Sequence, residues 1–475
     1  MKKFDLIVIG SGPAGEKAAV KAAYFGHKVA LVEKEQKYGG AGVQTGTLPS
    51  KTLKETALYL SGIYQKGVFG VDKELGRSTG VHDFMYRNVV VTEHMNEMVR
   101  HNLENHGVEI FEGFASFLSE HEIKITGSLE QIIEGKHIII ATGSYPFHPE
   151  NIPFDQKRIH DSDSILNIKR FPKSICVLGA GVIGCEYATI FGAMGVKTFI
   201  INNRDNILGF LDQEISSSLV EQMRNNGINI LFNNSITDFE VPEDESEPLS
   251  LQLKSGEILH VDMFLFAAGR SGQIKGLNAE KIGLEIGNRE TIVVNDQFQT
   301  NISHIYAVGD VVGFPALAST SMEQGRIAVT HMFDTEDIES LANIYPFGIY
   351  TVPEVSMVGL TEQEAKENKV NYAVGRCYFR DTARGMIMGD NDNGYLKLVF
   401  DKNSKVILGV HIMGYTATEL IHYGMELVRE KKTLDYVINT VFNYPTFHDL
   451  YKYASYDGLG LLAGKIVKKA GELIK

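Results

Sequence analysis

The sequence predicts an α/β fold in which one strand–turn–helix–strand unit occurs twice and an α+β unit follows. The first copy reads LIVIGSGPAGEKAAVKAAYFGHKVALVE from Leu6, and the second reads ICVLGAGVIGCEYATIFGAMGVKTFIIN from Ile175. Each copy holds G-x-G-x-x-G after an apolar run, and 16 residues separate its first glycine from the glycine that follows the helix. Two such motifs in one register are much stronger evidence than a single glycine-rich turn, so we interpret them as two Rossmann-like dinucleotide-binding units.

The glycines of the first motif have separate physical roles. Gly10 permits the tight turn after the strand, Gly12 lets a pyrophosphate approach the backbone, and Gly15 lets the helix pack closely on the strand. Pro13 suits the first helical turn, where its missing N–H costs nothing, and the free N–H groups of that turn attract phosphate. The second motif repeats this register with Gly179, Gly181 and Gly184. We therefore expect one dinucleotide in each unit.

The rest of the chain supplies elements that complete this plan. KHIIIATGSYP (136–146) predicts a buried strand and a glycine turn after the first copy, and MFLFAAGRSG (263–272) is its counterpart after the second. DFEVPEDESEP predicts an acidic hairpin connection on the surface. From about Pro346 the sequence reads as strands followed by helices without a nucleotide motif, and Thr361 is a predicted helix cap. This pattern of strands followed by helices predicts the C-terminal α+β unit.

Composition and charge exclude several classes of protein. The 475 residues are 44% hydrophobic and carry a formal net charge of −13, so the chain is typical of a soluble globular protein and lacks the basic footprint of nucleic-acid binding. The sequence shows no uncharged apolar run of about 18 residues, which predicts no membrane span, and its first apolar run is too short for a signal peptide. Three scattered cysteines indicate neither a disulfide framework nor a metal site, so we expect a cytoplasmic protein without a bound metal.

From Asp5 to about Leu461 the chain resembles the flavoprotein disulfide reductase family, which includes dihydrolipoamide dehydrogenase and glutathione reductase. The order of the two glycine motifs matches that family, and TNISHIYAVGD (300–310) is similar to its second flavin motif. The resemblance implies an FAD-binding domain, an NAD(P)-binding domain inserted into it, and a C-terminal dimerisation domain. The expected ranges are 1–150 (FAD-binding, first part), 151–272 (NAD(P)-binding), 273–345 (FAD-binding, second part) and 346–475 (dimer interface).

The resemblance also implies which residues bind the cofactors. Glu33, at the end of the second strand, suits the ribose hydroxyls of FAD, and Asp310 is expected to hold the ribityl chain. Beyond these two and the six motif glycines, the expected cofactor contacts are Lys34, Gly40, Gly42, Lys51, Ala115, Thr142, Gly143, Gly269, Arg270 and Ala318.

The residues that carry the family's thiol chemistry are replaced in this chain. Gly42 and Thr47 stand where the family has Cys-x-x-x-x-Cys, and Tyr444 in FNYPTFHDL stands where it has an acid–base histidine. A phenol, with a pKa of about 10, is a poor proton shuttle at neutral pH. Lys51 and Glu186, in contrast, occupy the positions of the family's ion pair beside the flavin. We expect catalytic positions at Lys51, Glu186, Thr47 and Tyr444, with Tyr444 supplied by the partner chain of a homodimer.

The end of the second unit's second strand bears on the choice of nicotinamide nucleotide. Asn202 has the register of Glu33, and Asn203 and Arg204 follow it. An acidic residue there would repel the 2′-phosphate of NADP, whereas asparagine still hydrogen-bonds a hydroxyl and arginine pairs with phosphate. This neutral residue with one arginine predicts a site that accepts both NAD and NADP.

Within the family, the chain resembles the soluble pyridine nucleotide transhydrogenase branch. GAGVIGCEYATIFGAMGVK, FLDQEIS, IYTVPEVSMVG and FNYPT carry this likeness, although the branch usually retains the first cysteine where this chain has Gly42. The resemblance implies ping-pong hydride transfer from NADPH to NAD⁺ through N5 of FAD, with one nicotinamide site and no redox-active disulfide. An NAD(P)H:quinone or dye reductase and a non-catalytic flavoprotein stay open as alternatives, while the missing cysteines and histidine disfavour dihydrolipoamide dehydrogenase.

Overall fold

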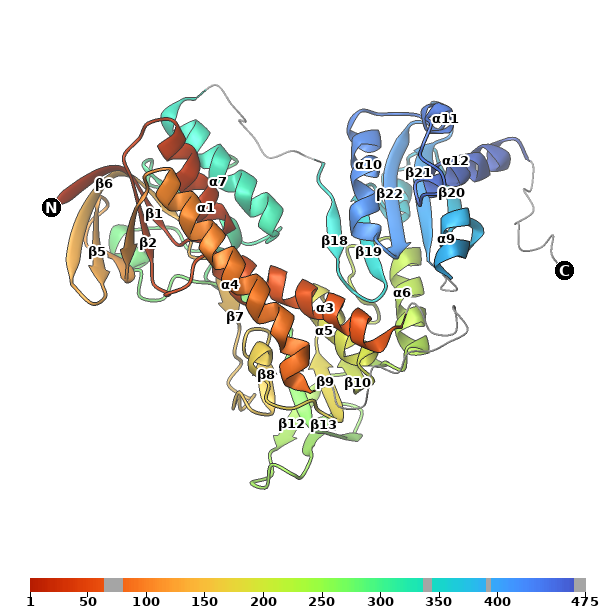
Figure 1. Cartoon of the computed structure of the whole chain (residues 1–475), viewed down its shortest axis with the longest axis horizontal. Helices are drawn as coiled ribbons and strands as arrows, with labels where there is room; N and C mark the ends of the chain where they lie inside the picture. Colours follow the sequence, from red (N-terminus) through yellow and green to blue (C-terminus); the bar gives the residue numbers. More distant parts are fainter. Residues whose placement is uncertain (64–79, 336–343, 390–393, 465–475) are drawn as a thin grey trace.

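The computed structural model describes residues 1–63, 80–335, 344–389 and 394–464. Within these ranges the elements form two Rossmann-like units and a C-terminal α+β unit, so the predicted fold class is confirmed. In Figure 1 the N-terminal and C-terminal units form two arms, and the second dinucleotide unit lies below and between them. The four domain ranges stay predictions, and the last includes residues 465–475, which lie outside the described part of the chain.

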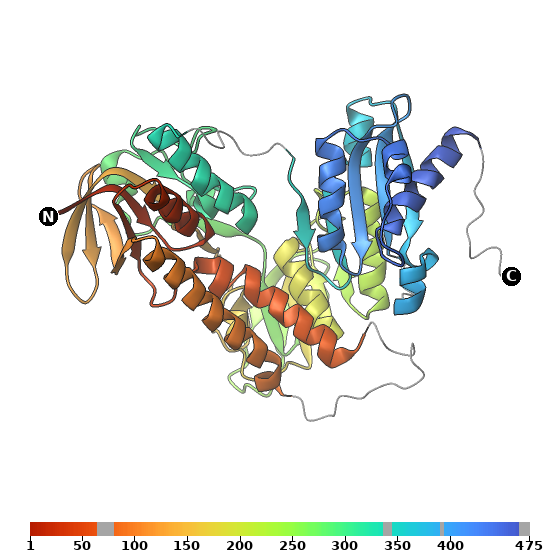
Figure 2. The same ribbon diagram turned by 45° about the horizontal axis from the view of Figure 1, so that its top comes forward.

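The N-terminal unit is built on a sheet with strand order β3-β2-β1-β6-β5-β4, in which β17 also pairs with β6. The pairs that join β3, β2, β1, β6 and β17 are parallel, and β5 and β4 continue the sheet as antiparallel strands. The helices α1 and α7 pack side by side (Figure 2). The bounds are β1 (Lys2–Ile9), α1 (Pro13–Tyr24), β2 (Val29–Glu33), α2 (Gly40–Gln44), α3 (Thr47–Ser61), α4 (Val81–Asn105), β3 (Glu109–Glu112), β4 (Phe114–Phe117), β5 (Glu122–Thr126), β6 (Gln131–Ile140), β17 (Ile305–Ala307) and α7 (Ala318–Phe333).

The second unit repeats this topology in the parallel sheet β11-β10-β9-β15-β8. A small antiparallel sheet, β12-β13-β14, contains the predicted acidic hairpin, and the short pair β7–β16 connects the unit to the first. The bounds are β7 (Ser144–Pro146), β8 (Ile159–Asp161), β9 (Ser174–Leu178), α5 (Val182–Ala193), β10 (Lys197–Ile201), α6 (Gln213–Asn225), β11 (Asn229–Leu231), β12 (Ile236–Glu240), β13 (Leu249–Leu253), β14 (Ile258–Val261), β15 (Met263–Phe266) and β16 (Arg270–Gly272).

The two glycine motifs adopt the same backbone geometry, which confirms the repeat. Gly10 and Gly179 have φ angles of +106° and +109°, a backbone region that residues with a β-carbon rarely adopt. A β-carbon at Gly15 would lie 2.0 Å from the Gly10 carbonyl oxygen, and one at Gly184 would lie 2.0 Å from that of Gly179. In both copies the third glycine therefore lets the helix begin against the turn, as the spacing predicts.

The C-terminal unit is the antiparallel sheet β18-β19-β22-β21-β20 with helices packed on it. Helix α10 packs on β19 and β22, and α12 packs on β20 and β21. The predicted cap is confirmed at Thr361, whose Oγ1 accepts from the Glu364 amide while the Glu364 carboxylate accepts from the Thr361 amide. The bounds are β18 (Phe347–Ile349), β19 (Glu354–Gly359), α8 (Glu362–Glu367), β20 (Tyr372–Tyr378), α9 (Ala383–Met388), β21 (Tyr395–Asp401), β22 (Ile407–Gly414), α10 (Ala417–Arg429), α11 (Leu434–Asn439) and α12 (Asp449–Leu462).

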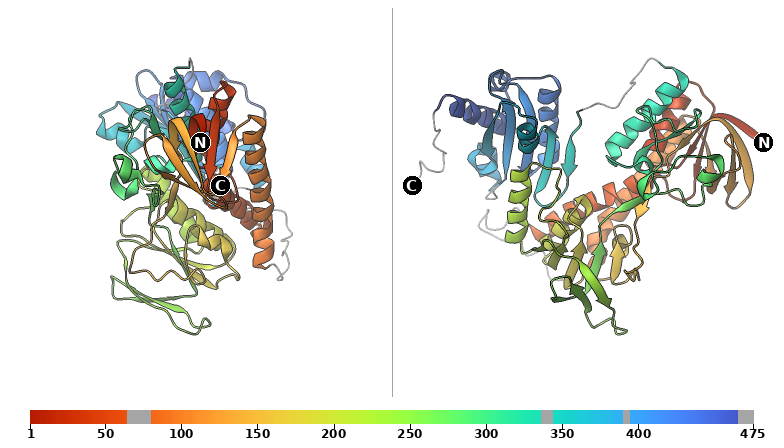
Figure 3. Two further views of the ribbon diagram at one scale, coloured as in Figure 1. Left: turned by 90° about the vertical axis from the view of Figure 1, so that its left-hand side faces the viewer. Right: turned by 180° about the vertical axis from the view of Figure 1, so that it is seen from behind.

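Helix α3 connects the three units. It begins in the N-terminal unit, packs against α4 and α5, and reaches the base of the C-terminal unit, as the view from behind in Figure 3 also shows. Among the described residues, no helix has the length and apolar character needed to cross a lipid bilayer. The course of α3 matters for function because its first turns line the site described next.

Candidate active site

A cavity of about 1840 Å³ lies where the three units meet. This volume exceeds the roughly 300–1,000 Å³ of a single ligand pocket, so the cavity offers room for more than one ligand. It brings together most of the predicted site residues. The predicted residues that line it are Gly10, Gly12, Glu33, Lys34, Gly40, Gly42, Thr47, Lys51, Ala115, Thr142, Gly143, Glu186, Arg270, Asp310 and Ala318.

One end of the cavity is a narrow cradle of backbone. A β-carbon at Gly40 would lie 2.9 Å from the Cα of Gly12, so a side chain at Gly40 would meet the backbone of the first glycine motif. Glu33 lies beside this cradle with only 6% of its surface exposed. Its carboxylate accepts hydrogen bonds from the amide of Ser11 (2.8 Å), the hydroxyl of Ser11 (2.6 Å) and the amide of Glu35 (3.0 Å). Sequence analysis missed Ser11, although its place between two motif glycines was a usable signal.

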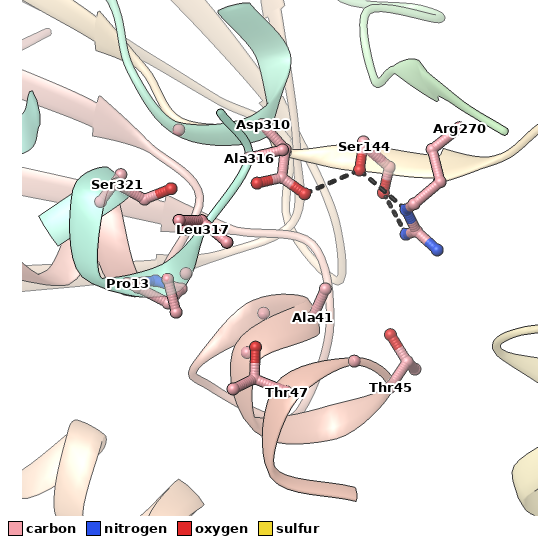
Figure 4. Close-up of a pocket in the computed structure, with 18 of the residues that line it drawn as sticks. Pro13, Ala41, Thr45, Thr47, Ser144, Arg270, Asp310, Ala316, Leu317 and Ser321 are labelled. Atoms are coloured by element: carbon pink, nitrogen blue, oxygen red, sulfur yellow. Dashed lines mark hydrogen bonds between the residues drawn. The ribbon is translucent and has the colours of Figure 1, made fainter. Parts of the chain in front are cut away.

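Asp310 lies at the other side of the cavity, at the end of a line of hydrogen bonds (Figure 4). The Ser144 hydroxyl donates to Asp310 Oδ2 (2.9 Å), and Arg270 Nε donates to Ser144 Oγ (2.9 Å). Arg270 Nη1 also donates to Asp163 Oδ1 (3.0 Å). Nearby, the buried Thr142 hydroxyl has no hydrogen-bond partner among the described residues, which leaves it free for a ligand. The glycine cradle, the two hydrogen-bonded carboxylates and this unpartnered hydroxyl fit the binding of FAD.

Lys51 and Glu186 form an ion pair in the middle of the cavity. Lys51 Nζ lies 2.9 and 2.8 Å from the two carboxylate oxygens of Glu186, although the residues come from α3 and α5 of different units. The Ser50 hydroxyl and the Tyr350 amide donate to the same carboxylate at 3.2 and 3.0 Å. Glu186 is 3% exposed and the Lys51 side chain is 24% exposed, so the carboxylate is enclosed while the lysine still faces the cavity.

Of the two positions of the missing dithiol, Gly42 lies in the middle of α2 and Thr47 begins α3. Thr47 is the first residue of α3 and lines the cavity near Ala41 and Thr45 (Figure 4). A β-carbon at Gly42 would lie 2.7 Å from Cγ of Pro13, so the glycine permits α2 to close on α1. The chain's three cysteines are buried free thiols that do not line the cavity, and burial raises the pKa of each. They are therefore inert toward a substrate disulfide.

The cavity is also lined by Val182 and Ile183 of α5 and by the rings of Phe210 and Phe347, whose centroids are 5.6 Å apart. The predicted ribose residues lie elsewhere. Asn202 follows β10, and its amide nitrogen donates to the carbonyls of Asn206 (2.7 Å) and Arg204 (3.5 Å), so it holds the loop that carries the exposed Arg204. The predicted residues that do not line the large cavity are Gly15, Gly179, Gly181, Gly184, Asn202, Asn203, Arg204, Gly269 and Tyr444.

Tyr444 is not in the cavity of its own chain. It is 73% exposed, on the loop before α12. Asp449, the first residue of α12, is buried, and one of its carboxylate oxygens has no hydrogen-bond partner among the described residues. Burial raises the pKa of this carboxyl. A role for Tyr444 at a flavin therefore requires a second chain.

Comparisons with known proteins agree with this geometry. Residues 4–325 match the pyridine nucleotide-disulphide oxidoreductase family, and residues 345–455 match the pyridine nucleotide-disulphide oxidoreductase dimerisation domain. The chain is 41% identical over 460 residues to the soluble pyridine nucleotide transhydrogenase of Mycobacterium bovis (96% of this chain, 97% of the relative), and 40% identical over 464 residues to that of Yersinia enterocolitica (97% and 98%).

Solved structures of similar fold include the copper complex of the HOCl-induced flavoprotein disulfide reductase RclA from Escherichia coli. The TM-score is 0.86 at 25% identity, and the match covers 96% of this chain and 100% of that chain. The fold also matches LpdA from Mycobacterium tuberculosis, with a TM-score of 0.87 at 22% identity over 96% and 99% of the two chains. The chain belongs to the pyridine nucleotide-disulphide oxidoreductase family.

Proposed function

We propose that this protein is an FAD-dependent transhydrogenase that moves a hydride from NADPH to NAD⁺ without a redox-active disulfide. The observation that carries the proposal is the Lys51–Glu186 ion pair in a cavity that no cysteine lines. Relatives at 40–41% identity over nearly the whole chain bear the name soluble pyridine nucleotide transhydrogenase, which supports the same activity here.

The residues that would hold FAD belong to the N-terminal unit. The Gly10–Gly15 turn and the start of α1 would bind its pyrophosphate, Glu33 the adenosine ribose, and Asp310 the ribityl chain. When bound, FAD would supply the two-electron redox chemistry for hydride exchange between two nicotinamide nucleotides. Lys51 would stabilise the negative charge that the ring gains on reduction, because a preoriented cation costs no reorganisation when charge develops.

The second unit would bind the nicotinamide nucleotide at the Gly179–Gly184 turn. Arg204 is exposed in the loop after β10, so it suits the 2′-phosphate of NADP. Asn202 adds no negative charge, which leaves NAD acceptable as well. Since hydride exchange between two nicotinamides moves few protons, the chain has little need of the missing histidine.

The proposed assembly is a homodimer, supported by the match of residues 345–455 to a dimerisation domain. In it, Tyr444 of each chain would complete the flavin site of the other. We also propose the cytoplasm as the place of action, because the buried free thiols suit a reducing compartment.

The test is a hydride-transfer assay with NADPH and the thionicotinamide analogue of NAD⁺, whose reduced form absorbs apart from NADPH. We expect rapid reduction of the analogue and no turnover of lipoamide. The variant Lys51→Met should retain FAD and lose about 100-fold in rate, while Lys405→Met, at an exposed ion pair, should keep the wild-type rate. Bleaching of the flavin by NADPH without analogue reduction would refute the proposal and point to a quinone, dye or oxygen as acceptor.

A further inference from the structure

A second lysine lies on the same face of α3 as Lys51. Lys54 is three residues further along the helix, and residues at this spacing are neighbours on a helix surface. Its side chain is only 4% exposed, and its Nζ lies 2.5 Å from Oε1 of Glu354, which is 9% exposed and begins β19 of the C-terminal unit. The ammonium also contacts Glu55, whose carboxylate is 69% exposed. Burial acts to lower the pKa of Lys54, but the Glu354 carboxylate outweighs it and the pKa lies above its ordinary value.

Tyr350 lies between the two lysines. Its ring centroid is 4.9 Å from Nζ of Lys51 and 6.0 Å from Nζ of Lys54, within the range of cation–π attraction. Its backbone amide donates to the Glu186 carboxylate at 3.0 Å. One residue of the C-terminal unit therefore contacts both members of the catalytic ion pair and the buried lysine behind it.

The far end of this chain of contacts is fixed to α10. Glu354 Oε2 accepts from the amide (3.0 Å) and the hydroxyl (2.7 Å) of Thr418, in the first turn of that helix. Lys51 and Tyr350 line the cavity, whereas Lys54 and Glu354 do not. The contact from Lys54 toward Lys51 runs through the Tyr350 ring, while Thr418, which also lines the cavity, gives Glu354 a separate contact with the cavity wall.

We propose that the Lys54–Glu354 ion pair is a positioning device that acts through the Tyr350 ring to hold Lys51 at the flavin ring. This inference rests on the proposed function only in taking FAD as the group beside Lys51. Without the device Lys51 Nζ keeps its bonds to Glu186 and Ser50 but loses the fixed Tyr350 ring on one side, so its place beside the flavin is less well defined. The negative charge that the flavin gains on two-electron reduction is then less well stabilised, and the midpoint potential becomes more negative.

The experiment measures the midpoint potential of the bound flavin in the holoenzyme by equilibration with redox dyes and a chemical reductant. No nicotinamide is present, so the result does not depend on the hydride acceptor. Lys54→Met and Tyr350→Leu should each lower the equilibrium constant for two-electron reduction about tenfold, which corresponds to about 30 mV. Stopped-flow reduction by NADPH should slow in the same two variants.

Three variants serve as controls. Lys54→Arg keeps the buried cation and Tyr350→Phe keeps the ring, so both should hold the wild-type potential. Lys397→Met removes another fully buried lysine that joins the second unit to the C-terminal unit, where its Nζ lies 2.8 Å from Asp212. It should lower stability as Lys54→Met does and leave the potential unchanged, because it does not touch Tyr350. If Lys54→Met fails to retain FAD, Tyr350→Leu alone tests the proposal, because both ion pairs remain in the Tyr350→Leu variant.

Wild-type potentials in Lys54→Met and Tyr350→Leu would overturn the proposal and make the second pair a structural contact only. An equal shift of the midpoint potential in Lys397→Met would overturn the proposal as well. It would show that weakening any contact between the units changes the potential, whether or not the contact includes Tyr350. The expected shifts in a protein that fails to reduce the NAD⁺ analogue would support the positioning role and refute only the transhydrogenase function.

Discussion

Gly42 is where the structure departs most from what the family's chemistry requires. With no side chain at this position, α2 approaches Pro13 so closely that a β-carbon would meet its ring at 2.7 Å. A proline ring is rigid and cannot rotate away from an added methyl group, so the packing of α2 on α1 depends on the glycine. The absence of a cysteine side chain at position 42 therefore affects the packing of α2 on α1 as well as the thiol chemistry.

We expect Gly42→Ala to lower the free energy of unfolding by about 1–3 kcal/mol, because the added methyl group overpacks the contact with Pro13. Thermal unfolding of the holoenzyme measures the loss, and flavin absorbance reports whether FAD is retained. Adding Pro13→Ala to the Gly42→Ala variant should recover most of the lost free energy of unfolding. Gly209→Ala, where the nearest atom is 3.6 Å from the added carbon, is the matched control and should change little. Equal stability of Gly42→Ala and wild type would show that α2 moves freely away from Pro13.

At the scale of elements, Asp212 ties the start of two helices together across a unit boundary. Its Oδ1 accepts from the Glu214 amide (3.1 Å) at the start of α6, and its Oδ2 accepts from the Glu362 amide (3.0 Å) at the start of α8. The fully buried Lys397 of β21 pairs with the same carboxylate. Burial acts to raise the pKa of Asp212, but the charges of His411 and Lys397, with the hydrogen bonds, outweigh it and lower the pKa.

Asp212→Asn should therefore destabilise the protein by about 2 kcal/mol at pH 7. Because folding lowers the pKa of this carboxyl, its contribution is present above the unfolded value of about 3.9 and is lost as the pH falls through the folded value. The difference between wild type and variant in urea unfolding, followed by circular dichroism, should hold from pH 7 to pH 5 and shrink below about pH 4. Asp435→Asn, at an exposed ion pair with Lys405, should show little difference at any of these pH values. A difference for Asp212→Asn that stays constant down to pH 3 would mean that the carboxylate charge is not what stabilises the junction.

At the scale of the whole molecule, we expect the exposed apolar residues of the C-terminal unit to form the interface between two chains. Val441 is 91% exposed and Tyr444 is 73% exposed on the loop before α12, and Tyr456 is 47% exposed on that helix. Exposed apolar side chains gathered on neighbouring elements are typical of an interface between chains. Because this loop carries Tyr444, the same interface would complete the flavin site.

We expect light scattering to give a mass of about twice the 52.6 kDa chain. Val441→Glu with Tyr456→Glu should yield single chains that have lost hydride transfer, since buried charges without partners oppose association. Val293→Glu, at an exposed apolar residue of the N-terminal unit, should stay dimeric and active. A wild-type protein of single-chain mass with full activity would contradict the shared site.

The sequence by itself determined the two dinucleotide units, the family and the cofactor cradle, because glycines at fixed spacing specify a local turn that needs no tertiary information. It also predicted that Lys51 and Glu186 meet, through the resemblance and not through spacing, since 135 residues separate them. Only the tertiary structure decided which side chains surround that pair. Tyr350, Lys54 and Glu354 come together because α3 crosses from one unit to another, and a contact between distant segments has no periodic signature in a sequence. The same holds for Gly42, whose meaning depends on a proline ring that lies next to it only in the folded chain.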